Sequence, residues 1–210
     1  MSTVTEVSAS AHSAAAPARM ALYGRLAELF SFPTPDLIDA YVSGALRDEL
    51  EQLSDAVPYT LPLEGGLRVG RGDGISSDYI RIFDVPSGGS TCPLYGGVLT
   101  GDRRQVMEDL LRMYRHFGLT TANAELGDLP DSIPTVLEFL GFLTYRECEA
   151  SDGDLKAVRR AQRDLLDRYL ARWAPIVVER VAALDPPPIY ADATLLLEGF
   201  VVGELQALVS

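Results

Sequence analysis

Apolar side chains recur every three or four residues along most of the chain, which is the spacing of amphipathic α-helices. The clearest example is 102–117, where one stripe holds Val106, Met107, Leu110, Leu111, Tyr114 and Phe117. The alternation typical of strands is scarce, and the nearest case, 57–61, is interrupted by a proline. The sequence therefore predicts an all-α fold. Its expected helices lie at about 18–31, 35–53, 76–84, 102–117, 132–149, 154–173, 175–184 and 190–209.

Two long segments between these helices lack the helical pattern and are rich in glycine. Residues 54–74 hold prolines 58 and 62 together with several glycines, and they predict a long connecting loop. Residues 85–101 are also glycine-rich, yet they carry Leu94, Tyr95 and other apolar side chains. A loop of that kind is expected to pack down or to bind something. We therefore expect a single-domain bundle of seven or eight helices with long functional loops.

The N-terminal residues differ in composition from the rest of the chain. Residues 1–17 are small and polar, which predicts a disordered tail ahead of an all-helical domain at 18–210. They contain no positively charged segment followed by an apolar run, so a secretory signal is not expected. No apolar stretch reaches the ~18 residues that a bilayer span requires. We expect a cytoplasmic protein without direct membrane insertion.

Charge and residue counts exclude several classes of function. The formal net charge of −12 argues against nucleic acid as the main partner. It suits a basic partner such as an Arg-rich peptide, and it equally suits a protein kept soluble by its acidity. Cys92 and Cys148 stand in unrelated contexts and are expected to be reduced thiols rather than zinc ligands. With only two histidines, a di-iron site is also not expected, and we predict no metal or cofactor of its own.

Sequence motifs for catalysis are missing as well. The stretch GLRVGRGDG, residues 66–74, looks like a phosphate loop but lacks the lysine and the preceding strand, so a flexible connector is expected there. No G-x-S-x-G motif is present, and no histidine is placed near either cysteine. The acids Glu147 and Glu149, and the pair Arg159–Arg160, are predicted to lie on solvated helix faces. The chain is not expected to be an enzyme.

One charged residue stands out in an otherwise apolar helix. Glu138 lies within 131–143, and a buried carboxylate without a partner is costly. Two interpretations remain open: Glu138 pairs with an arginine or sits on an exposed strip, or it lines a groove that accepts a cation from a ligand. Two acids and four aromatic residues could edge and wall such a groove: Asp128, Asp131, Tyr79, Phe83, Tyr95 and Tyr114. An Arg-bearing amphipathic peptide would match that groove.

Four motifs occur in an order that resembles the TorD/DmsD/NarJ-type chaperones, which mature molybdenum oxidoreductases. They are DYIRIFDVP (78–86), CPLYGG (92–97), DRRQVMEDLLRMYRHFGL (102–119) and LPDSIPTVLEFLGFL (129–143), and RWAP (172–175) resembles a later W-x-P segment. The likeness spans about 19–184. Ser132 stands where TorD and DmsD carry histidine, so that histidine's roles are not transferred. Pro134 and CPLYGG resemble the NarJ side, in particular the chaperones of selenate and chlorate reductases and of dimethylsulfide and ethylbenzene dehydrogenases.

The resemblance implies a TorD-like helical fold without catalysis. It implies that the chain binds the N-terminal twin-arginine leader of a molybdoenzyme catalytic subunit, assists molybdenum cofactor insertion and holds back export until then. Glu138 and Asp131 would receive the arginines, while the aromatics and Leu94 would take the apolar part of the leader. Whether Glu138 contacts the peptide or supports the fold stays open. The expected peptide-binding residues are Tyr79, Phe83, Leu94, Tyr95, Tyr114, Asp128, Asp131, Pro134 and Glu138.

Two other functions remain as alternatives. The glycine-rich stretch at 66–74 and the general link of the family to cofactor insertion allow a nucleotide or pterin-cofactor-binding accessory protein. A small-molecule-binding helical regulator is weakened because no basic DNA-reading helix is present. We expect a monomer, with a domain-swapped dimer permitted by the long segment 54–74.

Overall fold

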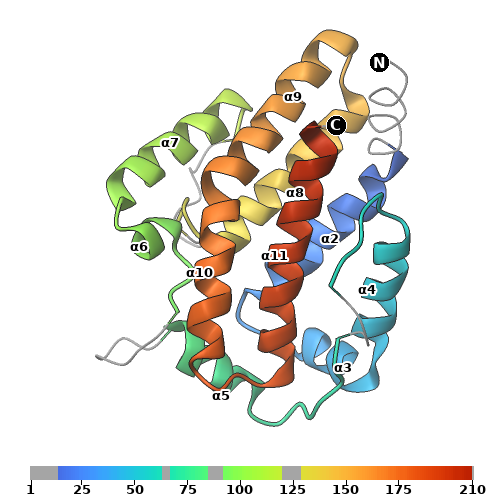
Figure 1. Ribbon diagram of the computed structural model, residues 1–210, viewed down its shortest axis with the longest axis vertical. Helices are drawn as coiled ribbons and strands as arrows, with labels where there is room; N and C mark the ends of the chain where they lie inside the picture. The colour runs from blue at the N-terminus through green and yellow to red at the C-terminus, as the bar shows by residue number, and fades with distance from the viewer. Residues whose placement is uncertain (1–13, 63–66, 85–91, 120–128, 210) are drawn as a thin grey trace.

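The computed structural model describes residues 14–62, 67–84, 92–119 and 129–209 (Figure 1). Within these ranges the chain forms nine continuous helical segments and no strand, which confirms the all-α prediction. The only strand-like pairing there is a single antiparallel bridge between Tyr95 and Ser132. The first helix begins at Ala16, two residues before the predicted start of the helical domain, and most of the predicted tail, residues 1–13, lies outside the described residues.

The helical elements form a bundle, and several of them are short. They are α2 (Ala16–Leu29), α3 (Pro35–Ser43), α4 (Ala45–Asp55), α5 (Ile75–Tyr79), the π-helix η1 (Ile80–Asp84), α6 (Gly96–Thr100), α7 (Arg103–His116), α8 (Ile133–Glu149), α9 (Asp152–Leu165), the π-helix η2 (Leu166–Leu170), α10 (Ala171–Ala182) and α11 (Pro188–Val209). No helix among the described residues is both long and apolar enough to cross a membrane.

Helix α8 occupies the centre of the bundle, as its apolar sequence predicts. Leu137, Leu140 and Leu143 are completely buried, and α2 packs along most of the length of α8. At Gly141 the two helices are in close contact, since a Cβ atom there would lie 3.4 Å from Cβ of Tyr23. Figure 1 shows α10 and α11 running antiparallel in front of α8 and α2.

Three helix boundaries differ from the prediction. Gly44, with φ of 86°, ends α3 and divides the expected helix 35–53 into α3 and α4. Helix α6 occupies part of the expected loop 85–101, of which 85–91 lie outside the described residues. The predicted break before Pro175 is wrong, because the helix continues from α9 through η2 into α10. Trp173, Ala174 and Val177 are buried around Pro175, and their packing outweighs the missing N–H of the proline.

The apolar face of the short helical segment formed by α5 and η1 also differs from the prediction. The sequence predicts Tyr79, Ile80 and Phe83 on one apolar side, but Ile80 is 43% exposed while Ile82 is completely buried. The reason is the π-helical turn η1, whose wider spacing rotates the following residues relative to an α-helix.

Arg81 joins this π-helix to the turn between α10 and α11. Its guanidinium donates to the carbonyl oxygens of Leu184, at 2.6 Å, and of Asp185, at 3.3 Å. The hydroxyl of Tyr190 donates to the carbonyl oxygen of Ile75 at 3.1 Å. These bonds hold α5 and η1 against the start of α11.

A buried charged cluster joins the two ends of the chain. Arg19 on α2 is completely buried and donates to both carboxylate oxygens of Glu204 on α11, at 2.8 and 2.9 Å. It also donates to Glu147 on α8 at 2.9 Å and to Gln162 on α9 at 2.9 Å. Tyr23 donates to Glu204 as well, at 2.7 Å. Four helices are therefore fastened around one guanidinium.

The cluster corrects the prediction that Glu147 lies on a solvated face. Glu147 is only 5% exposed, and besides Arg19 it accepts hydrogen bonds from Gln162 and from Arg159, whose side chain is 25% exposed. Burial opposes ionisation of Glu147, but the charge of Arg19 and these hydrogen bonds outweigh it and lower the pKa of the carboxyl to about 2. Glu147 is therefore a paired interior anion.

The segment after α4 lies against α11 at two glycines. The ring of Tyr59 and the ring of Pro62 would lie 2.3 Å from Cβ atoms added at Gly203 and Gly199, so larger residues do not fit there. The hydroxyl of Tyr59 donates to Glu204 at 2.7 Å and thereby extends the Arg19 cluster into this segment.

Candidate functional site

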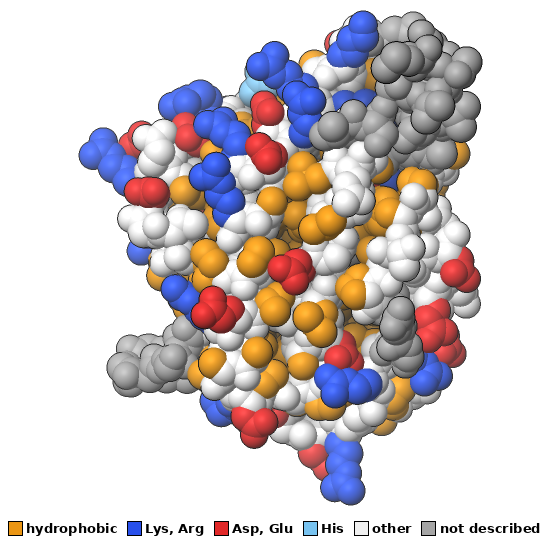
Figure 2. Space-filling view, viewed as in Figure 1, with side chains coloured by type: hydrophobic (Ala, Val, Ile, Leu, Met, Phe, Trp, Pro, Cys, Tyr) orange, Lys and Arg blue, Asp and Glu red, His pale blue; other side chains and the backbone are white. Residues whose placement is uncertain are grey.

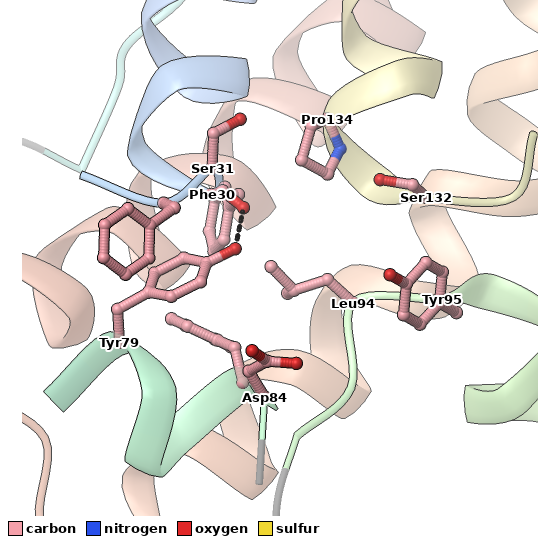
Figure 3. A pocket seen from close by; sticks show the side chains of 10 residues that line it. Phe30, Ser31, Tyr79, Asp84, Leu94, Tyr95, Ser132 and Pro134 are labelled. Carbon is pink, nitrogen blue, oxygen red and sulfur yellow. Dashed lines mark hydrogen bonds between the residues drawn. The ribbon is translucent and has the colours of Figure 1, made fainter. Parts of the chain in front are cut away.

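A pocket opens where the end of α2, η1, the segment before α6 and the start of α8 meet (Figure 3). Its volume is about 240 Å³. Aromatic and apolar side chains form most of its wall, with one carboxylate and two serines among them. The lining residues are Phe30, Ser31, Phe32, Tyr79, Phe83, Asp84, Leu94, Tyr95, Ser132 and Pro134.

The aromatic wall is fixed from its polar side. The hydroxyl of Tyr79 donates to the carbonyl oxygen of Phe30 at 3.0 Å, which ties η1 and α5 to the end of α2 (Figure 3). The ring of Tyr79 contacts Phe32 edge-on, with centroids 5.6 Å apart, and Phe83 at 5.1 Å. Phe32 remains 55% exposed, so the wall offers an aromatic side chain to a ligand from solvent.

Backbone hydrogen bonds hold the opposite wall, which contains Leu94 and Tyr95. The N–H of Cys92 donates to Ile82 at 2.8 Å, and the N–H of Ile133 donates to Leu94 at 2.9 Å. Burial raises the pKa of the Cys92 thiol to about 11, so this cysteine is a neutral core residue. At Gly96 a Cβ atom would lie 2.0 Å from the Trp173 ring, which explains the first glycine of CPLYGG.

Asp84 supplies the carboxylate of the pocket. It is exposed at the end of η1, and it forms no ion pair with any other residue that the structure describes. Figure 3 shows its carboxylate on the side of the pocket that faces Leu94 and Tyr79. An exposed anion beside aromatic rings is suited to receive a cationic side chain, because both the carboxylate and the ring faces attract positive charge.

The structure brings five of the predicted site residues together in this pocket. They are Tyr79, Phe83, Leu94, Tyr95 and Pro134. Tyr114 lies elsewhere: it is buried, it packs edge-on against Phe139 at 4.6 Å, and its hydroxyl donates to the carbonyl oxygen of Pro130 at 2.7 Å. Asp128 lies outside the described residues.

Asp131 is also placed away from the pocket. It is completely buried, and one carboxylate oxygen accepts the backbone N–H of Gly97 at 3.0 Å. The carbonyl oxygen of Asp131 accepts the N–H of Gly96 at 2.8 Å. Asp131 therefore fastens the start of α6 to the start of α8, and it supports the loop that carries Leu94 and Tyr95.

Glu138 lies on the exposed strip of α8, one helical turn beyond Pro134. It forms no ion pair within the described part of the chain. Of the interpretations left open by the sequence, the structure therefore does not show the internal arginine partner. Glu138 does not line the pocket either. An internal guanidinium does exist, but Arg19 is occupied by Glu147 and Glu204.

Five lining residues were not expected from the sequence: Phe30, Ser31, Phe32, Asp84 and Ser132. Two signals could have found them. Asp84 directly follows Phe83 within the motif DYIRIFDVP, and Phe30 and Ser31 end the predicted first helix, with Phe32 next to them just before Pro33. Phe32 is informative because it is exposed and does not fill the core, whereas Phe30 is buried.

Comparison with known proteins defines the class to which this chain belongs. Residues 40–179, more than half of the chain, match the family described as nitrate reductase delta subunit, and the chain belongs to that family. The resemblance to TorD/DmsD/NarJ-type chaperones is thereby confirmed. The matched region contains most of the residues that line the pocket, which are Tyr79, Phe83, Asp84, Leu94, Tyr95, Ser132 and Pro134.

Three curated relatives are assembly chaperones. The selenate reductase assembly chaperone protein of Thauera selenatis is 36% identical, over 53% of this chain and 59% of the relative. The chlorate reductase assembly chaperone protein of Ideonella dechloratans is 29% identical, over 78% and 76%. The dimethyl sulfide dehydrogenase assembly chaperone protein of Rhodovulum sulfidophilum is 32% identical, over 63% and 60%. The chain thus spans less than two thirds of the first and third of these relatives. All three are chaperones rather than enzymes, in agreement with the prediction of no catalysis.

Proposed function

We propose that this protein is a cytoplasmic, monomeric assembly chaperone that binds the N-terminal leader of a molybdoenzyme catalytic subunit in the pocket around Tyr79. It holds the apoprotein while the molybdenum cofactor is inserted, and it delays export until then. The observation that carries the proposal is the pocket itself, in which aromatic walls stand beside the carboxylate of Asp84, which has no ion-pair partner among the residues that the structure describes.

The chemistry of the pocket matches an arginine beside apolar residues. A guanidinium can stack on the exposed ring of Phe32 while it donates hydrogen bonds to Asp84, and Leu94 and Pro134 offer surface to a neighbouring apolar side chain. Asp84 is a better candidate than Asp131, because Asp131 is completely buried and does not line the pocket, and one of its carboxylate oxygens accepts the N–H of Gly97. Glu138, exposed one turn beyond Pro134, is positioned for a second basic side chain of an extended leader.

The size of the pocket favours a peptide over a nucleotide or a pterin cofactor. A volume of about 240 Å³ is smaller than the ~300–1,000 Å³ of sites that enclose whole small molecules. It suits one or two side chains of a peptide whose remaining residues lie on the surface. Two glycines of the stretch 66–74 that resembles a phosphate loop have a packing reason, because Cβ atoms at Gly70 and Gly72 would lie 2.3 Å and 2.9 Å from Tyr41 and Ile38.

The test begins with the identity of the client. The chaperone is purified from its native host, and the bound catalytic subunit is identified by mass spectrometry. A synthetic peptide of its leader is then titrated into the chaperone by calorimetry. We expect binding that weakens as salt increases, because the contact with Asp84 is exposed and therefore screened.

A double-mutant cycle locates the contact. Asp84→Asn should weaken the wild-type leader about three- to tenfold, and it should have little further effect on a leader whose arginines are replaced by glutamine. Asp39→Asn, an exposed aspartate on α3, is the matched control and should leave binding unchanged. Equal affinity of wild type and Asp84→Asn for the natural leader would remove Asp84 from the site.

A further inference from the structure

The front of the molecule carries an exposed apolar surface that the pocket does not use. Figure 2 shows hydrophobic side chains gathered over α10 and α11, with few charged groups among them. On α11, Leu195 is 46% exposed and Val202 is 48% exposed. They are seven residues apart and lie on one side of the helix, about 10 Å from each other along its axis.

The neighbouring helix extends this surface. Pro175 and Ala182 are exposed on α10, and they are seven residues apart and so lie on one side of that helix, which packs against α11. We name the surface formed by Pro175, Glu179, Ala182, Leu195, Glu198 and Val202 the α10–α11 face. None of its residues lines the pocket around Tyr79. A contiguous exposed apolar surface is a common sign of a protein interaction site.

The charges on this face indicate what covers it. Glu198 stands between Leu195 and Val202, and Glu179 is exposed on α10. Neither glutamate forms an ion pair with another residue within the described ranges. The two other acids of α11 are engaged, because Asp192 pairs with Arg68 and Glu204 pairs with Arg19. The occupant should therefore offer apolar side chains and at least one basic group.

Two other occupants fit these charges less well. A second copy packed across a two-fold axis near Glu198 would bring identical carboxylates together, which costs free energy. Residues 1–13 of this chain contain no lysine or arginine, so they would not neutralise Glu179 or Glu198.

We propose that the α10–α11 face docks an amphipathic, lysine- or arginine-bearing helix in the mature part of the client catalytic subunit. The proposal rests on the proposed chaperone function, and it adds a second contact that is independent of the leader. Apolar residues at helical spacing on the client pack against Leu195 and Val202, and a basic residue pairs with Glu198.

The experiment measures two affinities for each variant of the full-length chaperone. The probes are the leader peptide and the leaderless catalytic subunit of the client identified by copurification. The double variant Leu195→Gln with Val202→Gln should bind the leaderless subunit at least tenfold more weakly and the leader peptide within twofold of wild type. Val42→Gln is the matched control, because Val42 is 44% exposed on α3, away from this face. Glu198→Gln should weaken the leaderless subunit about threefold.

The outcomes separate the two proposals. Unchanged affinity of the double variant for the leaderless subunit, or no binding of that subunit by wild type, overturns the α10–α11 proposal. The α10–α11 proposal is also overturned if sedimentation shows that wild type is a dimer and the double variant a monomer. It is overturned as well if the double variant loses affinity for the leader peptide and for the leaderless subunit to the same extent. If wild type does not bind the leader peptide, the pocket proposal is overturned. If wild type then still binds the leaderless subunit, the α10–α11 proposal remains supported. Thermal melts confirm that each variant is folded.

Discussion

The Arg19 cluster and the pocket around Tyr79 both combine charge with aromatic side chains, but they treat the charge in opposite ways. Arg19 is completely buried and donates to Glu204, Glu147 and Gln162. Asp84 is exposed and has no ion-pair partner among the residues described. A buried charge is tolerated only when its partners are complete, so the first region serves the fold. An unpaired charge at an aromatic rim costs little in the free chain and is available to a ligand.

The first way to break this comparison is to remove the guanidinium. Arg19→Leu leaves the carboxylates of Glu204 and Glu147 buried without their main partner, and it should lower the free energy of unfolding by about 3–5 kcal/mol. Arg25→Leu is the control, because Arg25 pairs with Glu28 and Glu49 near the surface and should cost less than about 1 kcal/mol. Urea unfolding measures both. Similar losses for the two variants would contradict the role of the cluster.

Acid should weaken the cluster in a defined direction. The pKa of Glu147 is lowered in the folded chain to about 2, from 4.5, so the unfolded chain takes up the proton first as the pH falls. The stability that Glu147 contributes is present above about pH 4.5 and is lost as the pH falls toward about 2. Glu147→Gln should cost about 1.5–3 kcal/mol at pH 7, and the difference from wild type should narrow below pH 4.5. Unfolding curves at pH 7, 5, 4 and 3 check this, and a constant difference would refute it.

The contact between Tyr59 and Gly203 of α11 tests how tightly the Arg19 cluster is enclosed. In Gly203→Ala the new Cβ would meet the Tyr59 ring at 2.3 Å, and the strain should cost about 1–3 kcal/mol. Gly24→Ala is the matched control, because nothing lies within 4 Å of a Cβ atom at that helical position. The control should be neutral or stabilise the protein by up to about 1 kcal/mol. Thermal melts of both variants decide, and a melting temperature for Gly203→Ala at or above wild type would show that the segment moves aside freely.

The smallest change concerns the pocket and should leave the fold intact. Phe32→Ala removes an aromatic side chain that is 55% exposed, so stability should change little, while the affinity for the leader peptide should fall about tenfold. Ile80→Ala is the control, because Ile80 is 43% exposed on the neighbouring η1 but does not line the pocket. Calorimetric titration of the leader into both variants compares them. Equal affinities would place the leader elsewhere.

The sequence predicted the bundle well because its helices carry regular apolar stripes. The helix at 102–117 and the central helix around Leu137 were found almost to the residue. Local rules failed where packing decides: buried side chains around Pro175 carry a helix through a proline, and the π-turn at Ile80–Asp84 rotates the expected face. Periodicity does not register such turns.

The site was predicted in part for a similar reason. Tyr79, Phe83, Leu94, Tyr95 and Pro134 lie within recognisable motifs and do meet in one pocket. The positions of the acidic residues were harder to predict, because the sequence alone does not reveal whether a carboxylate is buried or exposed. Asp131 proved to be an interior support and Glu147 the partner of Arg19, contacts between residues 34 and 128 positions apart in sequence. Asp84, which lines the pocket next to Phe83, was not predicted from the sequence.

Arg81 gives the pocket and the α10–α11 face a common mechanical anchor. Its guanidinium rests on two backbone carbonyls of the turn between those helices, while its own backbone forms part of the π-helix that carries Phe83 and Asp84. Together with the hydrogen bond from Tyr190 to Ile75 and the contact of the Tyr190 ring with Phe83, Arg81 therefore links the element that carries part of the pocket to the start of α11. Arg81→Ala would remove one of these links and leave the other two, so the position of Asp84 relative to α11 would be held less firmly but not released.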